Sequence, residues 1–241
     1  MNVLKPNYQR SQNAINATYF YAAIVAIQIA LYAFDLYFYY CYGQGFDSLK
    51  TIKTINRIIF VFYYISFLFS IISYIVGVLW FRRAYYNAHQ LDPATMRYKD
   101  GWTVWAGFIP IINFIIPYQI MQDIWRSIVR ILHLQKEINY PAVLINAWWL
   151  CYTFYAIFTY TGSYLPGKFF HSSLQRIETR FVLYIIAHIL QIMSLFASVV
   201  IIKKYIAAEI EIEELLEQPN DSIFSINTTV YQQSYDSTGN S

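Results

Sequence analysis

Charged residues are scarce in this chain of 241 residues. Asp, Glu, Lys and Arg make up 13% of it, whereas hydrophobic residues make up 57%. A soluble domain carries roughly a quarter charged residues, so the chain lacks the polar surface that a water-soluble globule needs. This shortage excludes a soluble enzyme and a disordered chain. The mild net charge of +3 gives no sign of a nucleic-acid partner.

Cysteines and the signatures of common active sites are scarce as well. The two cysteines, Cys41 and Cys151, lie in no CxxC pair and no His/Cys cluster. We therefore predict two unpaired packing residues and no metal site. The chain has no GxSxG, HExxH, P-loop or GxGxxG pattern, and these patterns mark common catalytic and nucleotide sites. We expect neither an enzyme nor a bound cofactor.

What the chain does have is long uncharged runs. They cover residues 11–34, 58–81, 101–122, 138–167 and 181–202. A bilayer core requires about 20 apolar residues in helical form. The runs predict an all-α protein, an integral membrane helical bundle whose first partner is the lipid bilayer.

We expect one membrane domain, residues 19–204, with four spans. The spans are predicted at about 19–42, 58–81, 142–161 and 181–202. The remaining segments are a polar N-terminal segment (1–18), polar loops (43–57 and 162–180), a basic segment (82–100), an acidic helix (205–218) and a disordered tail (219–241).

The run at 101–117 differs from the others because two prolines, Pro110 and Pro117, interrupt it. Each proline removes a backbone hydrogen bond and kinks or breaks a helix. We predict a re-entrant or kinked segment, with a fifth span as the alternative. Pro117 suits the first turn of a following helix. That helix, at 118–135, is amphipathic and is predicted to lie on the membrane surface.

Basic residues indicate the orientation. With four spans and the N-terminus inside, eleven of the 17 Lys and Arg residues lie on the inner side and six on the outer side. With five spans the split is nine to eight. Cytoplasmic loops carry the excess of basic residues. The count favours four spans with both termini in the cytoplasm.

Among the polar residues inside the predicted spans, the candidates for a functional role are Asp35, Asn146, His188 and Gln191. Burying a carboxylate at mid-membrane costs roughly 2.5–3.5 kcal/mol on insertion scales, which makes an intramembrane acid a candidate functional site. Asp35 is thus either a proton or cation ligand, or it lies near the outer interface or is paired with an Arg or Tyr. His188 and Gln191 share a helix face, and interhelical hydrogen bonding, with Asn146 as a candidate partner, is the simpler role for them.

Asn113 lies between the two prolines, where an unwound backbone would expose carbonyls to an ion or substrate. A structural amide that caps the break is the other interpretation. Four basic residues near the broken segment, Arg82, Arg83, Arg97 and Lys99, set topology or bind anionic headgroups.

The stretch 81–125 carries a pattern of uncommon residues at fixed spacing. Its members are Arg83, Asn87, Ala88, Arg97, Tyr98, Gly101, Trp102, Trp105, Pro110, Ile111, Asn113, Pro117, Tyr118, Gln119, Asp123 and Trp125. The pattern resembles a bacterial family filed as domain of unknown function 4328, and the pair Trp148–Trp149 also fits it. The chain departs from the family at Asp100 and Ala106. The resemblance implies a bacterial multi-spanning membrane protein and no activity, substrate or cofactor.

Two classes of function remain open at this stage. The first is a non-enzymatic membrane module in the bacterial inner membrane that binds a protein partner, a second copy of the chain or lipid at its cytoplasmic face. The second is a small transporter or channel-like protein that uses the break around Asn113. The first is favoured because the distinctive residues gather in one segment and no paired catalytic groups are present.

Overall fold

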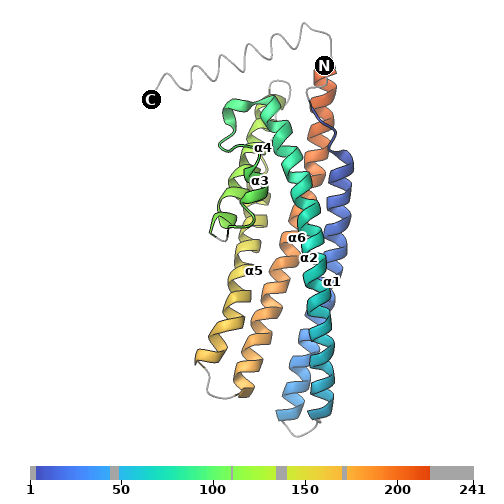
Figure 1. Ribbon diagram of the computed structural model, residues 1–241, viewed down its shortest axis with the longest axis vertical. Coiled ribbons are helices and arrows are strands. Elements are labelled where there is room, and N and C mark those ends of the chain that lie inside the picture. The colour runs from blue at the N-terminus through green and yellow to red at the C-terminus, as the bar shows by residue number, and fades with distance from the viewer. Residues whose placement is uncertain (1–3, 44–48, 110, 134–139, 170–172, 218–241) are drawn as a thin grey trace. The chain divides into compact units, whose positions relative to one another are not determined.

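The computed structural model describes residues 4–43, 49–109, 111–133, 140–169 and 173–217. Pro110, the end of the predicted surface helix and the tail 219–241 lie outside the described residues. The long helices are α1 (Tyr8–Gly43), α2 (Leu49–Leu91), α5 (Ala142–Phe169) and α6 (Ser173–Glu217) (Figure 1). The shorter elements are η1 (Pro93–Thr95), α3 (Trp102–Trp105), η2 (Ile112–Phe114) and α4 (Ile116–Leu132).

The predicted fold class is confirmed. The described residues form helices and no strand. Four of the helices, α1, α2, α5 and α6, are long and apolar enough to cross a membrane. The segment 101–117 contains only the short helices α3 and η2 and the first turn of α4, so the described part of it does not form a fifth span-length helix.

The helices extend beyond the apolar runs. Residues 49–57, predicted to be loop, lie in α2, and most of the predicted loop 162–180 lies in α5 and α6. Helix α1 likewise begins at Tyr8, inside the predicted polar segment. The reason is that polarity alone does not end a helix. The Asp92–Pro93 step does end α2, because the residue before a proline avoids the α region.

The chain divides into two compact units. Unit 1 comprises residues 1–12, 78–145 and 201–241, and unit 2 comprises residues 13–77 and 146–200. Helices α2 and α6 contribute substantial segments to both units, whereas α1 and α5 lie almost entirely in unit 2. The candidate site lies in unit 1, and the intramembrane polar residues lie in unit 2.

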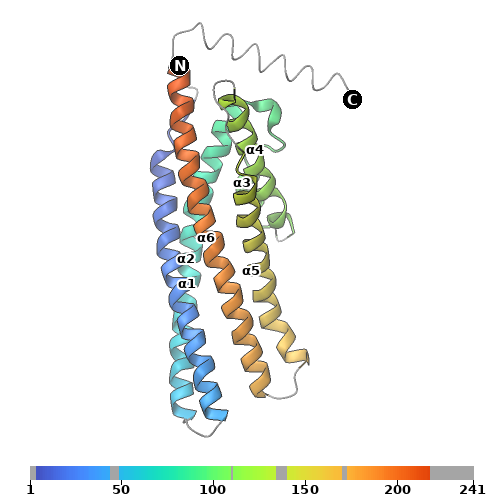
Figure 2. The same cartoon turned by 180° about the vertical axis from the view of Figure 1, so that it is seen from behind.

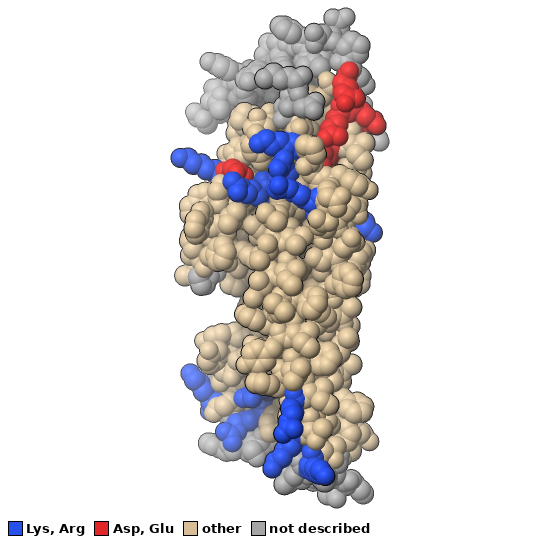
Figure 3. Space-filling model, turned by 45° about the vertical axis from the view of Figure 1, so that its right-hand side comes forward, with Lys and Arg blue, Asp and Glu red and all other residues tan. Residues whose placement is uncertain are grey.

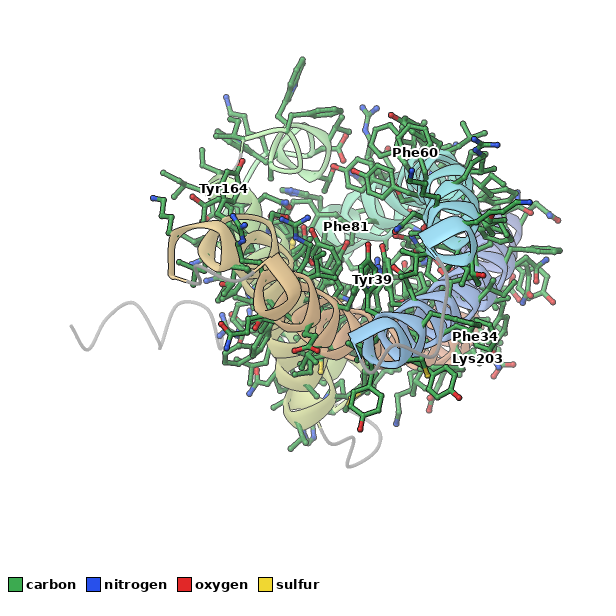
Figure 4. All side chains as sticks on the ribbon, turned by 90° about the horizontal axis from the view of Figure 1, so that it is seen from below. Phe34, Tyr39, Phe60, Phe81, Tyr164 and Lys203 are labelled. Atoms are coloured by element: carbon green, nitrogen blue, oxygen red, sulfur yellow. The ribbon has the colours of Figure 1, made fainter. Side chains whose placement is uncertain are left out.

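Unit 2 is built from the apolar parts of the four long helices. Large side chains such as Phe34 and Phe60 are exposed to the surroundings, and Tyr39 points inward (Figure 4). In α2 and α5 few residues of the apolar window are buried, whereas a third are buried in α1 and α6. Exposed apolar helix faces of this extent fit contact with lipid.

Unit 1 is built around α4. The predicted stripe of Ile120, Ile124, Ile128 and Ile131 is buried. The stripe thus packs inside the protein, where the sequence predicted contact with a membrane surface. An apolar stripe of this kind fits a protein core or a lipid surface equally well. The start of α1 and the end of α6 also belong to this unit, and they lie close together (Figure 2).

Candidate functional site

The centre of the candidate site is an ion pair between Arg97 and Asp123. Arg97 lies after η1, and Asp123 is fully buried on α4. Nε and Nη2 of Arg97 lie 2.8 and 2.7 Å from Asp123 Oδ1, and the backbone N–H of Arg97 donates to Oδ2 at 3.3 Å. Nη2 also donates to the carbonyl oxygen of Gln119 at 2.8 Å. The guanidinium therefore fixes the segment after η1 against α4.

The charges of this pair support each other. Partial burial works to lower the pKa of Arg97, but the hydrogen bond and the charge of Asp123 outweigh burial and raise that pKa above its ordinary value. A buried carboxylate is tolerated only with such partners. Arg126 adds a weaker contact, since its Nη1 lies 3.9 Å from Asp123 Oδ1 on the same helix.

Tyr98 continues the same attachment. Its N–H donates to the Tyr85 hydroxyl, and that hydroxyl donates to the Tyr98 carbonyl, both at 3.0 Å. His89 Nε2 lies 2.9 Å from the same carbonyl. The Tyr98 hydroxyl donates to the side chain of Gln119. Residue 98 is thereby held by α2 on one side and by α4 on the other.

Two further ion pairs complete this frame. Arg130 of α4 lies 3.1 Å from the buried carboxylate of Asp92, at the end of α2. Arg82 Nε lies 3.1 Å from Asp100 Oδ2. Figure 3 shows Lys and Arg side chains gathered close to a group of Asp and Glu side chains. We call residues 92–100, with their partners on α2 and α4, the ionic frame.

An apolar loop follows the ionic frame directly. We define the apolar loop as residues 102–109 and 111–115, which include α3 and η2. Its exposed large side chains are Trp105, Phe108, Ile109, Ile111, Phe114 and Ile115. Ile111 is 77% exposed and Phe108 is 66% exposed. Six large apolar side chains exposed within one short segment form a patch, and such a patch marks contact with a membrane or another protein.

Asn87 forms a second cluster in unit 1. Its Oδ1 accepts from the Lys5 N–H at 3.1 Å, and its Nδ2 donates to the Lys5 carbonyl at 2.9 Å and to Glu209 Oε1 at 2.8 Å. The Tyr205 hydroxyl donates to the same Glu209 oxygen at 2.9 Å. One amide thus joins the N-terminal segment, α2 and α6.

The space inside unit 1 is small. A cavity of about 10 Å³ lies among Asn87, Ile124, Tyr205 and Glu209. A cavity must have about 10–15 Å³ to hold one water molecule. This cavity is too small for an organic substrate. Among the described residues no group of three or more His, Cys, Asp or Glu is placed to hold a metal ion.

The other residues of the predicted pattern have varied positions. Trp125 is buried, Trp102 is half-buried and Gly101 is exposed. Pro117 lies in the first turn of α4, as expected for its fixed φ. The backbone N–H of Asn113 donates to the Ile109 carbonyl at 2.8 Å.

Two further members of the pattern are partly enclosed. Arg83 and Tyr118 are both half-buried. The structure thus brings Arg97, Tyr98, Gln119 and Asp123 of the pattern into one set of contacts, while Asn87 belongs to the separate cluster with Glu209.

The polar residues of unit 2 lie mostly inside. Asp35 is fully buried, and His188 and Gln191 are buried as well. The Nε2 of Gln191 donates to the Tyr21 hydroxyl at 2.6 Å, and His188 Nδ1 lies 2.7 Å from the Tyr184 carbonyl. Asn146 is exposed.

Sequence reasoning missed three important residues. Asp92 was not among the predicted site residues, although it pairs with Arg130. Tyr85 is fully buried and bonds both backbone groups of residue 98. Glu209 was predicted only as part of the acidic helix 205–218, and it is buried. The spacing of apolar residues on α2 could have indicated that Tyr85 is buried. No local sequence pattern indicates which partner each acidic residue takes.

One family description matches this chain. A family model described as "Domain of unknown function (DUF4328)" matches residues 46–207, more than half of the chain. No curated protein and no solved structure matches it.

Proposed function

The chain belongs to the family described as Domain of unknown function (DUF4328), and we propose that unit 1 is a non-enzymatic lipid-binding module of a membrane protein. The apolar loop is the part that enters the lipid. The observation that carries the proposal is the exposure of its large apolar side chains on a segment that the ionic frame fixes in place.

The position at which the apolar loop begins supports its entry into lipid. Asp100 lies two residues before the start of the loop and is paired with Arg82, which is the first charged residue after the uncharged run 58–81. If that run spans the membrane, Arg82 lies at the interface, where basic and aromatic residues anchor spans. The loop then begins at the interface, and Trp105 and Phe108 are residues that favour it.

The ionic frame supports the proposal because it holds the apolar loop in place before the loop enters lipid. A free loop with these side chains would lose conformational entropy on entering lipid. Here Arg97 and Tyr98 already hold the segment before the loop, and α4 holds the segment after it. Preorganisation of this kind lowers the cost of binding.

The basic residues support an inner-leaflet location. Unit 1 includes Arg82, Arg97, Arg126 and Arg130, and basic residues concentrate on the cytoplasmic side. We therefore include in the proposal that unit 1 and both termini are cytoplasmic, in a bacterial inner membrane. A cysteine replacing Gln90, which is exposed, should react with an impermeant maleimide only after the cells are lysed.

A fluorescent probe at the loop tests lipid entry. Cys41 and Cys151 are replaced by Ala, Ile111 by Cys, and an environment-sensitive fluorophore is attached in proteoliposomes. Lipids with a spin label on the acyl chain should quench it strongly, and aqueous iodide should quench it weakly. The matched control carries the same probe at Gln90, which should show the reverse pattern.

Either of two outcomes would contradict the proposal. Strong iodide quenching at Ile111 would mean that the loop lies in water. Protection from both quenchers would mean that protein covers the loop, and a protein partner or a second copy of the chain would then replace lipid. The alternative transport role around Asn113 has no comparable support, because its neighbours Ile111 and Phe114 are exposed apolar side chains.

A further inference from the structure

The inward face of α1 in unit 2 is unusually polar. Its positions recur at intervals of four and three residues, as in the seam of packed helices. They are Tyr21, Val25, Gln28, Tyr32, Asp35 and Tyr39. The first five are buried. In a membrane bundle, polar residues at such positions are expected to bond across to other helices.

Most of these polar side chains have a partner in unit 2. Tyr21 accepts from Gln191 at 2.6 Å, Gln28 accepts from Ser66 at 2.8 Å, and the Tyr39 hydroxyl accepts from Asn56 at 3.0 Å. Tyr32 instead packs its ring against α6. Three polar side chains of the seam thus have a hydrogen-bond partner on another helix.

Asp35 is the exception. It is fully buried, and both carboxylate oxygens lack a hydrogen-bond partner among the described residues. The four salt bridges formed by the described residues do not include it. An ionised carboxylate in such surroundings costs far more than a neutral one. Two occupants can remove the charge: a bound proton or a bound cation.

The surroundings of Asp35 favour a bound proton over a bound cation. The helix neighbours of Asp35, Tyr32 and Tyr39, lie against the Phe181 ring at 5.8 and 6.1 Å between ring centroids. Tyr32 also packs against the rings of Tyr184 and His188 of α6. A hard cation requires six or more oxygen ligands or several bound waters. The aromatic rings around Asp35 leave it without such a set.

No Lys, Arg or His of the described residues forms a salt bridge with Asp35. The titratable side chains in this part of the seam include Tyr32 and Tyr39 on α1, Tyr63 on α2, Tyr155 on α5, and Tyr184 and His188 on α6. Glu178 of α6 lies close to Leu36 and Tyr37 of α1. His188 is the one residue of this set that can become cationic, and its Nδ1 already bonds the Tyr184 carbonyl.

We propose that Asp35 is a proton-binding site in the interior of the membrane-spanning unit. The carboxylate takes one proton from water, becomes a neutral acid and returns the proton by the same path. The nearer end of α1 is Gly43, eight residues away or ~12 Å along a helix, whereas Tyr8 at the other end is much farther. Protons therefore enter from the side of the segment between α1 and α2.

Infrared spectroscopy tests the proton directly. The full-length protein in liposomes is compared with Asp35→Asn, which keeps the side-chain shape. The wild type should show the carbonyl band of a protonated carboxyl near neutral pH, and the band should be lost in the variant. An exposed acid, Glu214, serves as the control, since Glu214→Gln should keep the band. Absence of the band in a folded wild type would overturn the proposal.

Labelling with a carbodiimide distinguishes a bound proton from a bound cation. This apolar reagent dissolves in the bilayer. The protonated carboxyl transfers its proton to a reagent nitrogen while its oxygen bonds to the central carbon, and rearrangement gives a stable acylurea with no leaving group. The proposal predicts label at Asp35 that increases as the pH falls and is lost in Asp35→Asn. Protection by Na⁺ or Ca²⁺ at constant pH would overturn it in favour of a cation site.

Discussion

Each of the two units contains an aspartate with no exposed surface, Asp123 in unit 1 and Asp35 in unit 2, and the surroundings of the two differ. In unit 1, Asp123 accepts one hydrogen bond from Arg97 Nε and one from the Arg97 backbone, and Arg97 Nη2 lies within ion-pair distance of it. In unit 2, both oxygens of Asp35 lack a partner among the described residues. The same residue type, with the same burial, is thus an ion-pair acceptor in one unit and an isolated group in the other.

The comparison shows that burial alone does not determine whether a carboxyl group is charged. A buried carboxylate with an arginine partner remains charged and holds segments together, because removal of the partner would leave an uncompensated charge. A buried carboxylate with no partner avoids that cost by binding a proton. The first arrangement explains structure. The second arrangement holds no segments together, and intramembrane acids of this kind mark functional sites.

The largest expected effect comes from breaking the unit 1 pair. Arg97→Ala leaves Asp123 buried without its main partner, and loss of one member of a buried pair costs about 3–5 kcal/mol. Because the Arg97 side chain is 36% exposed, we expect a value near the lower limit. The free energy of unfolding, measured by titrating SDS into detergent micelles, should fall by about 3 kcal/mol.

Arg126 provides the matched control for this change. It also approaches Asp123, but at 3.9 Å and with a side chain that is 51% exposed. An exposed pair contributes about 0–1 kcal/mol, so Arg126→Ala should have little effect. Equal losses in the two variants would show that the Asp123 charge is not held by Arg97, and the contrast with Asp35 would fail.

The second effect concerns the amide that joins three segments. Asn87→Ala removes hydrogen bonds to both backbone groups of Lys5 and to Glu209. Leaving buried polar groups unsatisfied costs about 1–3 kcal/mol. We also expect faster hydrogen exchange at the Lys5 amide. The exposed Gln90 on the same helix supplies the control, since Gln90→Ala should change neither quantity.

The third effect is smaller and concerns the ionic frame. Tyr98→Phe removes the hydroxyl that donates to Gln119 but keeps both backbone bonds to Tyr85. A single hydrogen bond contributes about 0.5–1.5 kcal/mol. Its loss should loosen the apolar loop more than it destabilises the protein. The probe at Ile111 should then become more accessible to iodide, and an unchanged quenching pattern would mean that the frame does not position the loop.

Much of the fold could be predicted from the sequence, because the bilayer imposes a length and a composition on each span. The four predicted spans therefore correspond to the four long helices. Their ends could not be predicted in the same way. The polar residues 49–57 read as loop, yet no proline or glycine stops a helix there, and α2 includes them.

The candidate site could be predicted only in part. The resemblance singled out Arg97 and Asp123, and the structure joins them. The pairing itself is a contact between residues 26 positions apart, and no local pattern encodes it. The α4 stripe shows the same limit. Its spacing indicated an apolar face, but whether lipid or protein covers such a face depends on the rest of the chain, and here protein covers it.

The smallest effect is expected at Asp35, and it is the sharpest test of the comparison. Asp35→Asn exchanges one neutral group for another if the acid carries a proton, so the free energy of unfolding should change by less than about 1 kcal/mol. Asp123→Asn removes a charge that Arg97 uses and should cost about 2–3 kcal/mol. Both are measured in the same SDS titration. If Asp35→Asn were the more damaging change, Asp35 would hold an ionic partner, and the two buried aspartates would be alike.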